Sequence, residues 1–98
     1  MAKGDWIVRV DITDEPRYEA HIAANAEPLP RYGARFLVRG GQLENPEGRS
    51  RRRNAVIELP TYRAALDCRN SPGYREAIAL RKDVSTIDLI IIEGYEGT

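Results

Sequence analysis

The chain has 98 residues, which is enough for one domain built around a single hydrophobic core. Its 15 Lys and Arg residues balance 15 Asp and Glu residues, so the formal net charge is zero. This balance argues against a general nucleic-acid binder, because phosphate affinity depends on an excess of basic residues. It also removes the repulsion that keeps copies of a protein apart, which leaves association open.

The cysteine content and the apolar runs indicate a cytoplasmic protein. Cys68 is the only cysteine and has no partner for an internal disulfide, so we expect a reducing compartment. Residues 1–5 lack the apolar run of a secretory signal. Residues 89–92 form the longest strongly apolar run, far short of the ~20 residues that span a membrane. With one histidine and one cysteine in the chain, we expect no metal site, and since Gly33, Gly40 and Gly41 do not form a dinucleotide-binding fingerprint, we also expect no cofactor.

The first segment predicts a strand followed by a helix. Residues 6–12 alternate, with Trp6, Val8, Val10 and Ile12 on one side and Ile7, Arg9 and Asp11 on the other. Thr13 or Asp14 then offers an N-cap, and Pro16 suits a first helical turn. Pro28 and Pro30 should end or bend this helix. Its apolar side is formed by Tyr18, Ile22, Ala26 and Leu29.

The middle of the chain predicts two strands joined by a hairpin arm. Residues 34–39 place Phe36 and Val38 on one face and Arg35, Leu37 and Arg39 on the other. The two glycines at 40–41 close this strand, and residues 45–48 have the composition of a turn. In the next strand, residues 54–59, the alternation separates Ala55, Ile57 and Leu59 from Asn54, Val56 and Glu58.

The last third predicts a helix in two parts and a closing strand. Thr61 caps the first part, and residues 70–73 interrupt it. Ser71 can cap the second part, whose first residue is Pro72. One side of this part carries Tyr74, Ala77, Ile78 and Arg81. Residues 89–94 then read as the fourth strand.

This order of elements predicts an α+β fold in a single domain over residues 1–98. Two helices between four strands give the ferredoxin-like βαββαβ arrangement, a four-stranded antiparallel sheet with both helices on one face. In each strand, the alternate residues that are almost all apolar should lie under the helices, because unpaired charges placed there would cost several kcal/mol each. The second parity mixes charges with aliphatic residues, namely Ile7, Leu37, Val56, Leu89 and Ile91.

Such a mixed face is unusual for a monomer, so we expect two sheets to pack face to face as a homodimer. The charged residues would then pair inside the interface or line a cavity. The alternative is that Arg9, Asp11, Arg35 and Glu58 are ordinary solvated strand residues.

Four sequence motifs carry a resemblance to a family of small bacterial proteins, and they lie at residues 32–41, 56–60, 70–74 and 91–94. The family is domain of unknown function 1330, and the resemblance covers nearly the whole chain. It implies a dimeric α/β-barrel, in which ferredoxin-like subunits pair through their sheets. Relatives in that broad group include cofactor-free monooxygenases and muconolactone isomerases. The chain departs from the family pattern at Gly73, where an acidic residue is common, and at Pro28 and Pro30, where the first helix usually continues.

Arg39, Glu58 and Glu93 are the leading candidates for chemistry, since all three fall near strand ends on the mixed face. Arginine offers a planar fork for a carboxylate or enolate oxygen. A carboxylate in a partly apolar barrel can have its pKa raised and act as a general base. We therefore take Glu58 and Glu93 as catalytic candidates and add Arg9 as a ligand-binding residue on the same face. The competing interpretation is a structural ion pair between Arg39 and either acid.

Three other features are weaker. Tyr74 and Arg81 lie two turns apart on one helix side and can reach a cleft between the helix and the sheet, so Tyr74 joins the ligand-binding candidates. His21 shares a helix side with Tyr18 and Asn25, but a single histidine on such a helix is usually a surface or boundary residue. The basic run of Arg49, Arg51, Arg52 and Arg53 has no interleaved aromatic residue and is expected to be a solvated hairpin arm.

Two classes of function remain open. In the first, a homodimer binds a small anionic or carbonyl-bearing organic molecule and, if it is an enzyme, carries out cofactor-free proton transfer or oxygenation. In the second, the protein is not a catalyst and its charged face only specifies dimerisation. An open cavity with an unpaired arginine favours the first class, and a fully ion-paired interface favours the second.

Overall fold

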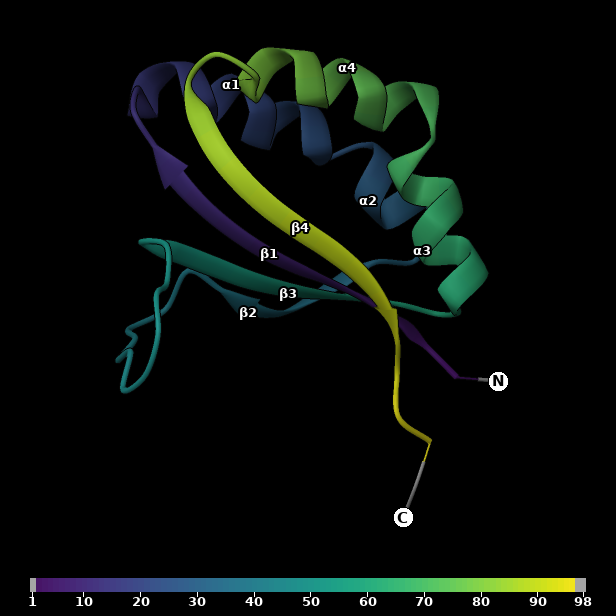
Figure 1. Cartoon of the computed structure of the whole chain (residues 1–98). Helices are drawn as coiled ribbons and strands as arrows, with labels where there is room; N and C mark the ends of the chain where they lie inside the picture. Colours follow the sequence, from purple (N-terminus) through teal and green to yellow (C-terminus); the bar gives the residue numbers. More distant parts are fainter. Residues whose placement is uncertain (1, 97–98) are drawn as a thin grey trace.

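The computed structural model describes residues 2–96 and shows a four-stranded antiparallel sheet covered by helices on one face (Figure 1). The strand order is β2-β3-β1-β4, which confirms the ferredoxin-like βαββαβ fold. The elements in chain order are β1 (Gly4–Ile12), α1 (Glu15–Asn25), α2 (Pro28–Arg31), β2 (Arg35–Arg39), β3 (Arg53–Leu59), α3 (Tyr62–Arg69), α4 (Pro72–Arg81) and β4 (Ser85–Glu93). None of the helices within residues 2–96 is long and apolar enough to cross a membrane.

The helix ends follow the capping signals in the sequence. Of the two residues that could cap α1, Asp14 does so, with its side chain accepting from the Arg17 N–H at 3.1 Å. Thr61 caps α3 and Ser71 caps α4, where Pro72 is the first residue. The prolines end the first helix as expected, since α1 stops at Asn25 and Pro28 begins the short helix α2.

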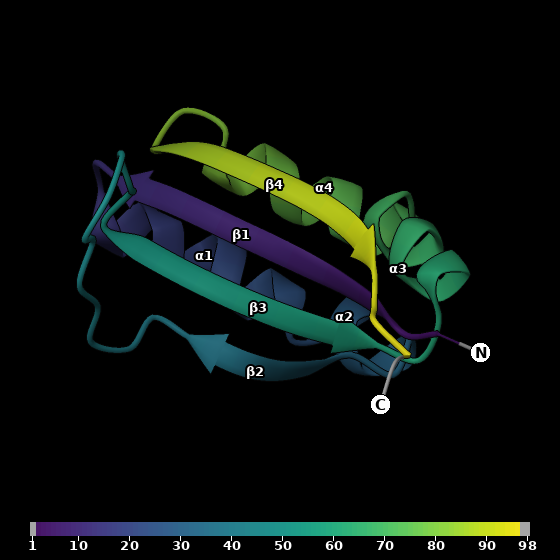
Figure 2. The same ribbon diagram turned by 60° about the horizontal axis from the view of Figure 1, so that its bottom comes forward.

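The core lies between the helices and the face of the sheet that carries Trp6, Val8, Val10 and Ile57, which we call the helix-covered face. Trp6 is fully buried, and its Nε1 donates to the Ala65 carbonyl of α3 at 3.1 Å. A Cβ on Gly4 would lie 2.7 Å from the Cα of Tyr62, so only glycine lets β1 approach α3 this closely. Figure 2 shows the opposite side of the sheet, which no helix covers and which we call the open face.

A β-bulge in β2 overturns part of the predicted face assignment. Phe36 is opposite Ile57, but the next paired residue is Val38, opposite Val56. Leu37 is therefore the extra residue of the bulge, and the residues after it exchange faces. Arg39 lies opposite Ala55 and so belongs to the helix-covered face, not to the open face as predicted.

The register of β4 corrects the prediction a second time. Leu89 is opposite Val8 and Ile91 is opposite Trp6, so both belong to the helix-covered face and not to the open face. Ile90 and Ile92 take their place on the open face. Residues 89–92 are all apolar, so alternation could not show which parity faces the helices. The predicted faces of β1 and β3 are confirmed by their register.

Candidate functional site

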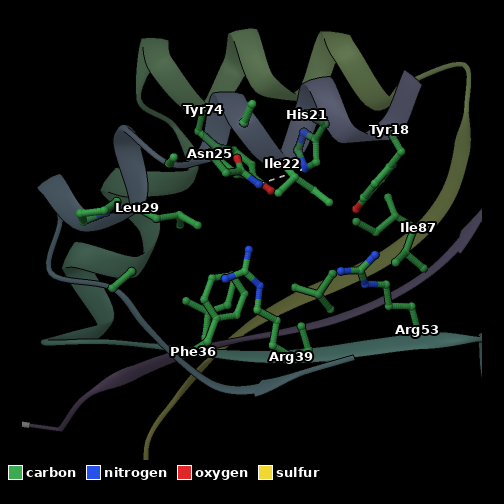
Figure 3. Close-up of a pocket in the computed structure, with 18 residues that line it drawn as sticks. Tyr18, His21, Ile22, Asn25, Leu29, Phe36, Arg39, Arg53, Tyr74 and Ile87 are labelled. Atoms are coloured by element: carbon green, nitrogen blue, oxygen red, sulfur yellow. Dashed lines mark hydrogen bonds between the residues drawn. The ribbon is translucent and has the colours of Figure 1, made fainter. Parts of the chain in front are cut away.

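A cavity of about 490 Å³ lies between the helices and the edge of the sheet where β2 pairs with β3. Its apolar lining includes Val8, Val10, Ile22, Leu29, Phe36, Ile57 and Ile87. Its polar lining consists of Tyr18, His21, Asn25, Arg39, Arg53 and Tyr74. Figure 3 shows the two arginines rising from the sheet, with Tyr18, His21 and Asn25 on the helix side of the same space.

The two arginines form the charged floor of this cavity. The Arg39 Cζ lies 4.2 Å from the centroid of the Phe36 ring, a cation–π contact that orients its guanidinium. Arg53 begins β3 opposite Val10, beside Gly40, whose φ of 65° is favourable only for glycine. A Cβ on Gly40 would lie 3.2 Å from Arg53 Nε, so the glycine also leaves room for this side chain. Within residues 2–96, neither guanidinium forms an ion pair with a carboxylate.

His21 is held in one neutral tautomer on the helix side of the cavity. Its Nδ1 lies 2.6 Å from the Ala77 carbonyl of α4, and a carbonyl only accepts, so Nδ1 carries the proton. The lone pair of Nε2 then accepts from Asn25 Nδ2 at 3.1 Å. Burial lowers the pKa of His21, which is 3% exposed. The hydrogen bond to the Ala77 carbonyl opposes this shift, and the positive charge of Arg81 lowers the pKa further. The expectation that His21 is a surface or boundary residue is therefore wrong, because it is buried.

Two buried tyrosines complete the helix side. Burial raises the pKa of both Tyr18 and Tyr74, and the positive charge of Arg81 opposes that rise in each. The Tyr74 ring packs edge-on against Trp6, with 4.9 Å between ring centroids. Both hydroxyl groups are therefore neutral at ordinary pH, and each is able to donate a hydrogen bond.

The structure brings together only two of the predicted site residues. Arg39 and Tyr74 both line the cavity, although Arg39 reaches it from the face opposite to the predicted one. Arg9 lies on the open face, where its Nη2 donates to the Arg49 carbonyl at 2.6 Å. Glu58 also lies there. Glu93 is opposite Gly4 at the end of β4, so it has the parity of the helix-covered face and not of the open face as predicted, and it is exposed.

Glu58 lacks the properties of the general base predicted for it. Arg35 Nε and Lys3 Nζ bind its Oε1 at 3.0 and 3.3 Å. Partial burial alone would raise the pKa of Glu58, but the hydrogen bonds from Lys3 and Arg35 outweigh burial and hold the pKa below its usual value. The expected rise in pKa is therefore wrong for this carboxylate.

Two further carboxylates of the open face are paired, both with Arg51, whereas Asp5 and Arg9 form no ion pair within residues 2–96 and Asp5 Oδ1 is buried without a hydrogen-bond partner. Arg51 bridges two strands, since its Nη1 lies 3.0 Å from Asp11 of β1 and its Nε lies 2.7 Å from Asp88 of β4. The basic run is therefore only partly a solvated arm, because Arg51 is ion-paired and Arg53 lines the cavity.

Four of the polar cavity residues were not proposed as ligand-binding residues from the sequence: Tyr18, His21, Asn25 and Arg53. The sequence could have identified Arg53, because β3 begins one residue earlier than predicted. Arg53 then alternates with Ala55 and Ile57 and lies on the same face of the sheet. Tyr18 lay on the predicted apolar side of α1, but spacing alone does not separate a core tyrosine from a cavity tyrosine.

Neither a metal centre nor a nucleophilic thiol is apparent in residues 2–96. No group of three His, Cys, Asp or Glu side chains in this part of the chain is arranged to hold a metal ion. Cys68 is buried, and burial raises the pKa of its thiol to about 11, so the thiolate needed for nucleophilic attack is scarce at neutral pH.

Several solved structures resemble this chain at low sequence identity. A protein of unknown function from Rhodopseudomonas palustris is 17% identical with a TM-score of 0.74, over 98% of this chain and 85% of that one. SnoaB, a cofactor-independent oxygenase from Streptomyces nogalater, is 13% identical with a TM-score of 0.65, over 99% and 97%. A dimeric ferredoxin-like protein of unknown function from Thermobifida fusca is 17% identical with a TM-score of 0.61, over 94% and 91%.

These likenesses establish the fold, and they are too distant in sequence to carry over an activity. No curated protein sequence matches the chain. The sequence profile of domain of unknown function 1330 matches residues 3–95, nearly the whole length. The chain therefore belongs to the family of domain of unknown function 1330.

Proposed function

We propose that this protein binds a small organic anion with a mainly apolar body in the cavity beneath α1 and α4. Arg39 and Arg53 hold the negatively charged oxygen, and the aliphatic and aromatic walls hold the body. The observation that carries the proposal is the pair of guanidiniums that line a mainly apolar cavity and have no carboxylate partner in residues 2–96.

Electrostatics favour an anion as the occupant. Two positive charges beside apolar walls attract a negative group, and Arg39 remains in contact with solvent because every residue of β2 is exposed. An arginine fork also matches the geometry of a carboxylate or an enolate. The volume of about 490 Å³ lies within the range of small-molecule sites, roughly 300–1,000 Å³. The cavity is therefore suited to a ligand of one or two rings with one acidic group.

The proposal includes cofactor-free acid–base chemistry on such a ligand. His21 is the cavity group suited to take a proton, because burial keeps it neutral and its Nε2 lone pair is held only by the Asn25 amide. The electron pair left on the ligand would move to an oxygen held by Arg39. The structural similarity to SnoaB, a cofactor-independent oxygenase, supports this class of chemistry. Cys68, the sole cysteine and a free buried thiol, fits the cytoplasmic location that we propose with it.

Binding is tested by calorimetric titration with 2-naphthoate and with 2-naphthamide, a neutral molecule of nearly the same shape. We expect the anion to bind at least about tenfold more tightly, which corresponds to about 1.4 kcal/mol. Arg39→Gln and Arg53→Gln should each abolish most of this preference. Arg52→Gln is the matched control, because it removes the same charge from an exposed position on the hairpin arm. Equal affinity for the two molecules in the wild type would contradict the proposal.

Catalysis is tested separately with 2-tetralone, an aromatic ketone with an acidic hydrogen beside its carbonyl. Exchange of that hydrogen for deuterium, followed by NMR, should be faster with the wild-type protein than in buffer. His21→Gln should remove the acceleration, and Glu58→Gln should leave it intact because Glu58 is on the open face. The same exchange rate with and without protein would exclude this activity.

The open face supports a second proposal, that two copies associate through it. It exposes Ile90 and Ile92 by 54% and 47%, together with Leu37 and Val38 by 48% and 45%. Monomers rarely expose an apolar patch over a whole sheet, and the ion pairs around it can fix the register of a partner. The protein from Thermobifida fusca, described as dimeric, is consistent with this. If the charged face has only a structural role, that role is this association, because most of its carboxylates are ion-paired and the cavity lies on the other face.

Sedimentation at micromolar concentration tests the association. We expect a dimer for the wild type and a monomer for Ile90→Asp. Leu80→Asp introduces the same charge at an exposed leucine of α4, 44% accessible, and should remain dimeric. A wild-type monomer of 11.1 kDa would exclude the dimer and leave the binding proposal untouched.

A further inference from the structure

The hydroxyl of Tyr18 is a polar group of the cavity that has no hydrogen-bond partner within residues 2–96. Tyr18 lines the cavity from α1 and is 6% exposed. Its oxygen stays accessible, whereas Asn25 Oδ1 is both unpartnered and sealed off. A tyrosine hydroxyl withdrawn from bulk water usually has a hydrogen-bond partner. The Tyr18 hydroxyl is therefore free to bind a group that enters the cavity.

Tyr18 lies at the end of the cavity where Arg53 is found. It packs against Val10 in one cluster of buried side chains, and Ile87 packs against the same cluster. Val10 is opposite Arg53 of β3 and opposite Ile87 of β4, so these three residues lie side by side across the sheet. Figure 3 shows the Tyr18 hydroxyl on the side of Arg53 and Ile87. We call this region the Val10 end of the cavity.

The opposite end of the cavity is mainly apolar. Leu29 and Ile57 line it and belong to the core cluster of Trp6. Tyr74 is the polar residue at this end, and its ring packs against Trp6. Trp6 is opposite Ile57 and precedes Val10 by four residues, which is about 13 Å along an antiparallel strand. The cavity is therefore elongated along β1, with Tyr18 and Arg53 at one end and Leu29 at the other.

Arg39 enters the cavity between these two ends. It is opposite Ala55, and Arg53 is two residues before Ala55 on β3, so the two arginines are diagonal neighbours on one face of the sheet. Diagonal neighbours lie roughly 7–8 Å apart, within reach of long side chains. A carboxylate has two oxygens and can accept from donors on both sides. Both guanidiniums can therefore contact one carboxylate that lies between the middle and the Val10 end.

We propose that Tyr18 is a specificity-determining residue that donates its hydroxyl proton to the carboxylate of the bound ligand beside Arg53. This inference rests on the function proposed above and specifies the class and the orientation of the ligand. Arg39 holds one carboxylate oxygen, and Arg53 and Tyr18 hold the other. The apolar body extends along β1 toward Leu29. The ligand is thus a carboxylate at one end of an elongated, flat body.

The chemistry of the phenol supports this role. Burial raises the pKa of Tyr18, so the hydroxyl keeps its proton at ordinary pH and can donate it in a hydrogen bond. A hydrogen bond to a carboxylate is roughly twice as strong as one to a neutral acceptor. Tyr18 therefore favours an acid over the amide of the same shape.

Calorimetry on Tyr18→Phe tests the contact, because this change removes the hydroxyl and keeps the buried ring. The affinity for 2-naphthoate should fall by roughly tenfold, and that for 2-naphthamide by less than about threefold. Tyr62→Phe is the matched control, since it removes a hydroxyl from an exposed tyrosine of α3 and should keep both wild-type affinities. An unchanged affinity of Tyr18→Phe for 2-naphthoate would overturn the inference.

The orientation is tested in the wild-type protein, without any substitution. Intermolecular NOEs are measured between 2-naphthoate and the methyl groups of the cavity. The ring protons beside the carboxylate should give NOEs to Val10 and Ile87, and the protons of the distant ring should give NOEs to Leu29. The reverse pattern would place the carboxylate at the apolar end and overturn the inference.

The outcomes distinguish this inference from the function on which it rests. If the wild type prefers 2-naphthoate and Arg39→Gln loses that preference, but Tyr18→Phe keeps it, only the role of Tyr18 is wrong. If the wild type has no preference for the anion, the proposed function fails and the role of Tyr18 fails with it.

Discussion

The open face and the helix-covered face of the sheet both carry arginines, but their environments are opposite. On the open face, Arg51 binds Asp11 and Asp88, and Arg35 binds Glu58. On the helix-covered face, Arg39 and Arg53 meet apolar side chains and make no ion pair within residues 2–96. An ion pair at a half-exposed site contributes little to stability and leaves little charge to attract a ligand. An unpaired cation beside an apolar cavity, in contrast, attracts an external anion. The helix-covered face, whose unpaired arginines border a cavity, is therefore the better candidate for ligand binding.

Core packing should show the largest difference between the two faces. Trp6→Ala on the helix-covered face should lower the free energy of unfolding by about 3–5 kcal/mol, because it leaves a cavity and removes the bond to Ala65. Ile90→Ala on the open face should change it by less than about 0.5 kcal/mol in the dilute monomer. Urea unfolding followed by circular dichroism measures both. Similar losses for the two variants would show that the open face is part of the folded core.

The pH dependence of stability should come from the helix-covered face near neutral pH. Burial holds the pKa of His21 below the unfolded value of about 6.5, so the unfolded state binds more protons as the pH falls through that value. The stabilisation is thus present above about pH 6.5 and is lost toward acid, with a limiting slope of about 1.4 kcal/mol per pH unit. Urea unfolding between about pH 8 and pH 5.5 should show this slope in the wild type, and His21→Gln should remove it. A slope that persists in His21→Gln would assign the titration to another group.

Ion pairs of the open face should have the smallest effects. Arg51→Ala should cost about 0.5–1 kcal/mol, since its side chain is 27% exposed and both partner carboxylates are more exposed still. Arg63→Ala, which breaks the exposed pair with Asp67 on α3, should cost about 0.3–0.5 kcal/mol. Added salt should reduce both values in urea unfolding. A loss of several kcal/mol for Arg51→Ala at high salt would mean that this bridge holds the sheet together.

The sequence was sufficient for the fold because local signals agreed with one another. The caps at Thr61 and Ser71, the proline breaks and the alternation in β1 and β3 all indicated the same βαββαβ order. The family resemblance was independent of those signals and is confirmed by the match over residues 3–95.

The candidate site was harder to predict because it depends on register. A single extra residue, Leu37, moves Arg39 across the sheet, and nothing in a run of alternating residues reveals a bulge. In β4, residues 89–92 are all apolar, so the sequence did not show which of them face the helices. Burial of His21 depends on the packing of α1 against α4, which brings the Ala77 carbonyl to its ring, and a single helix pattern does not contain that contact.

NMR of the arginine side chains shows on which face of the sheet the anion binds. The Nε–H signals are assigned by Arg→Lys substitution and followed during titration with 2-naphthoate. We expect saturable shifts for Arg39 and Arg53, on the helix-covered face, and unchanged signals for Arg9 and Arg35. Shifts confined to Arg9 and Arg35 would place the anion site on the open face and would show that its assignment to the cavity is wrong.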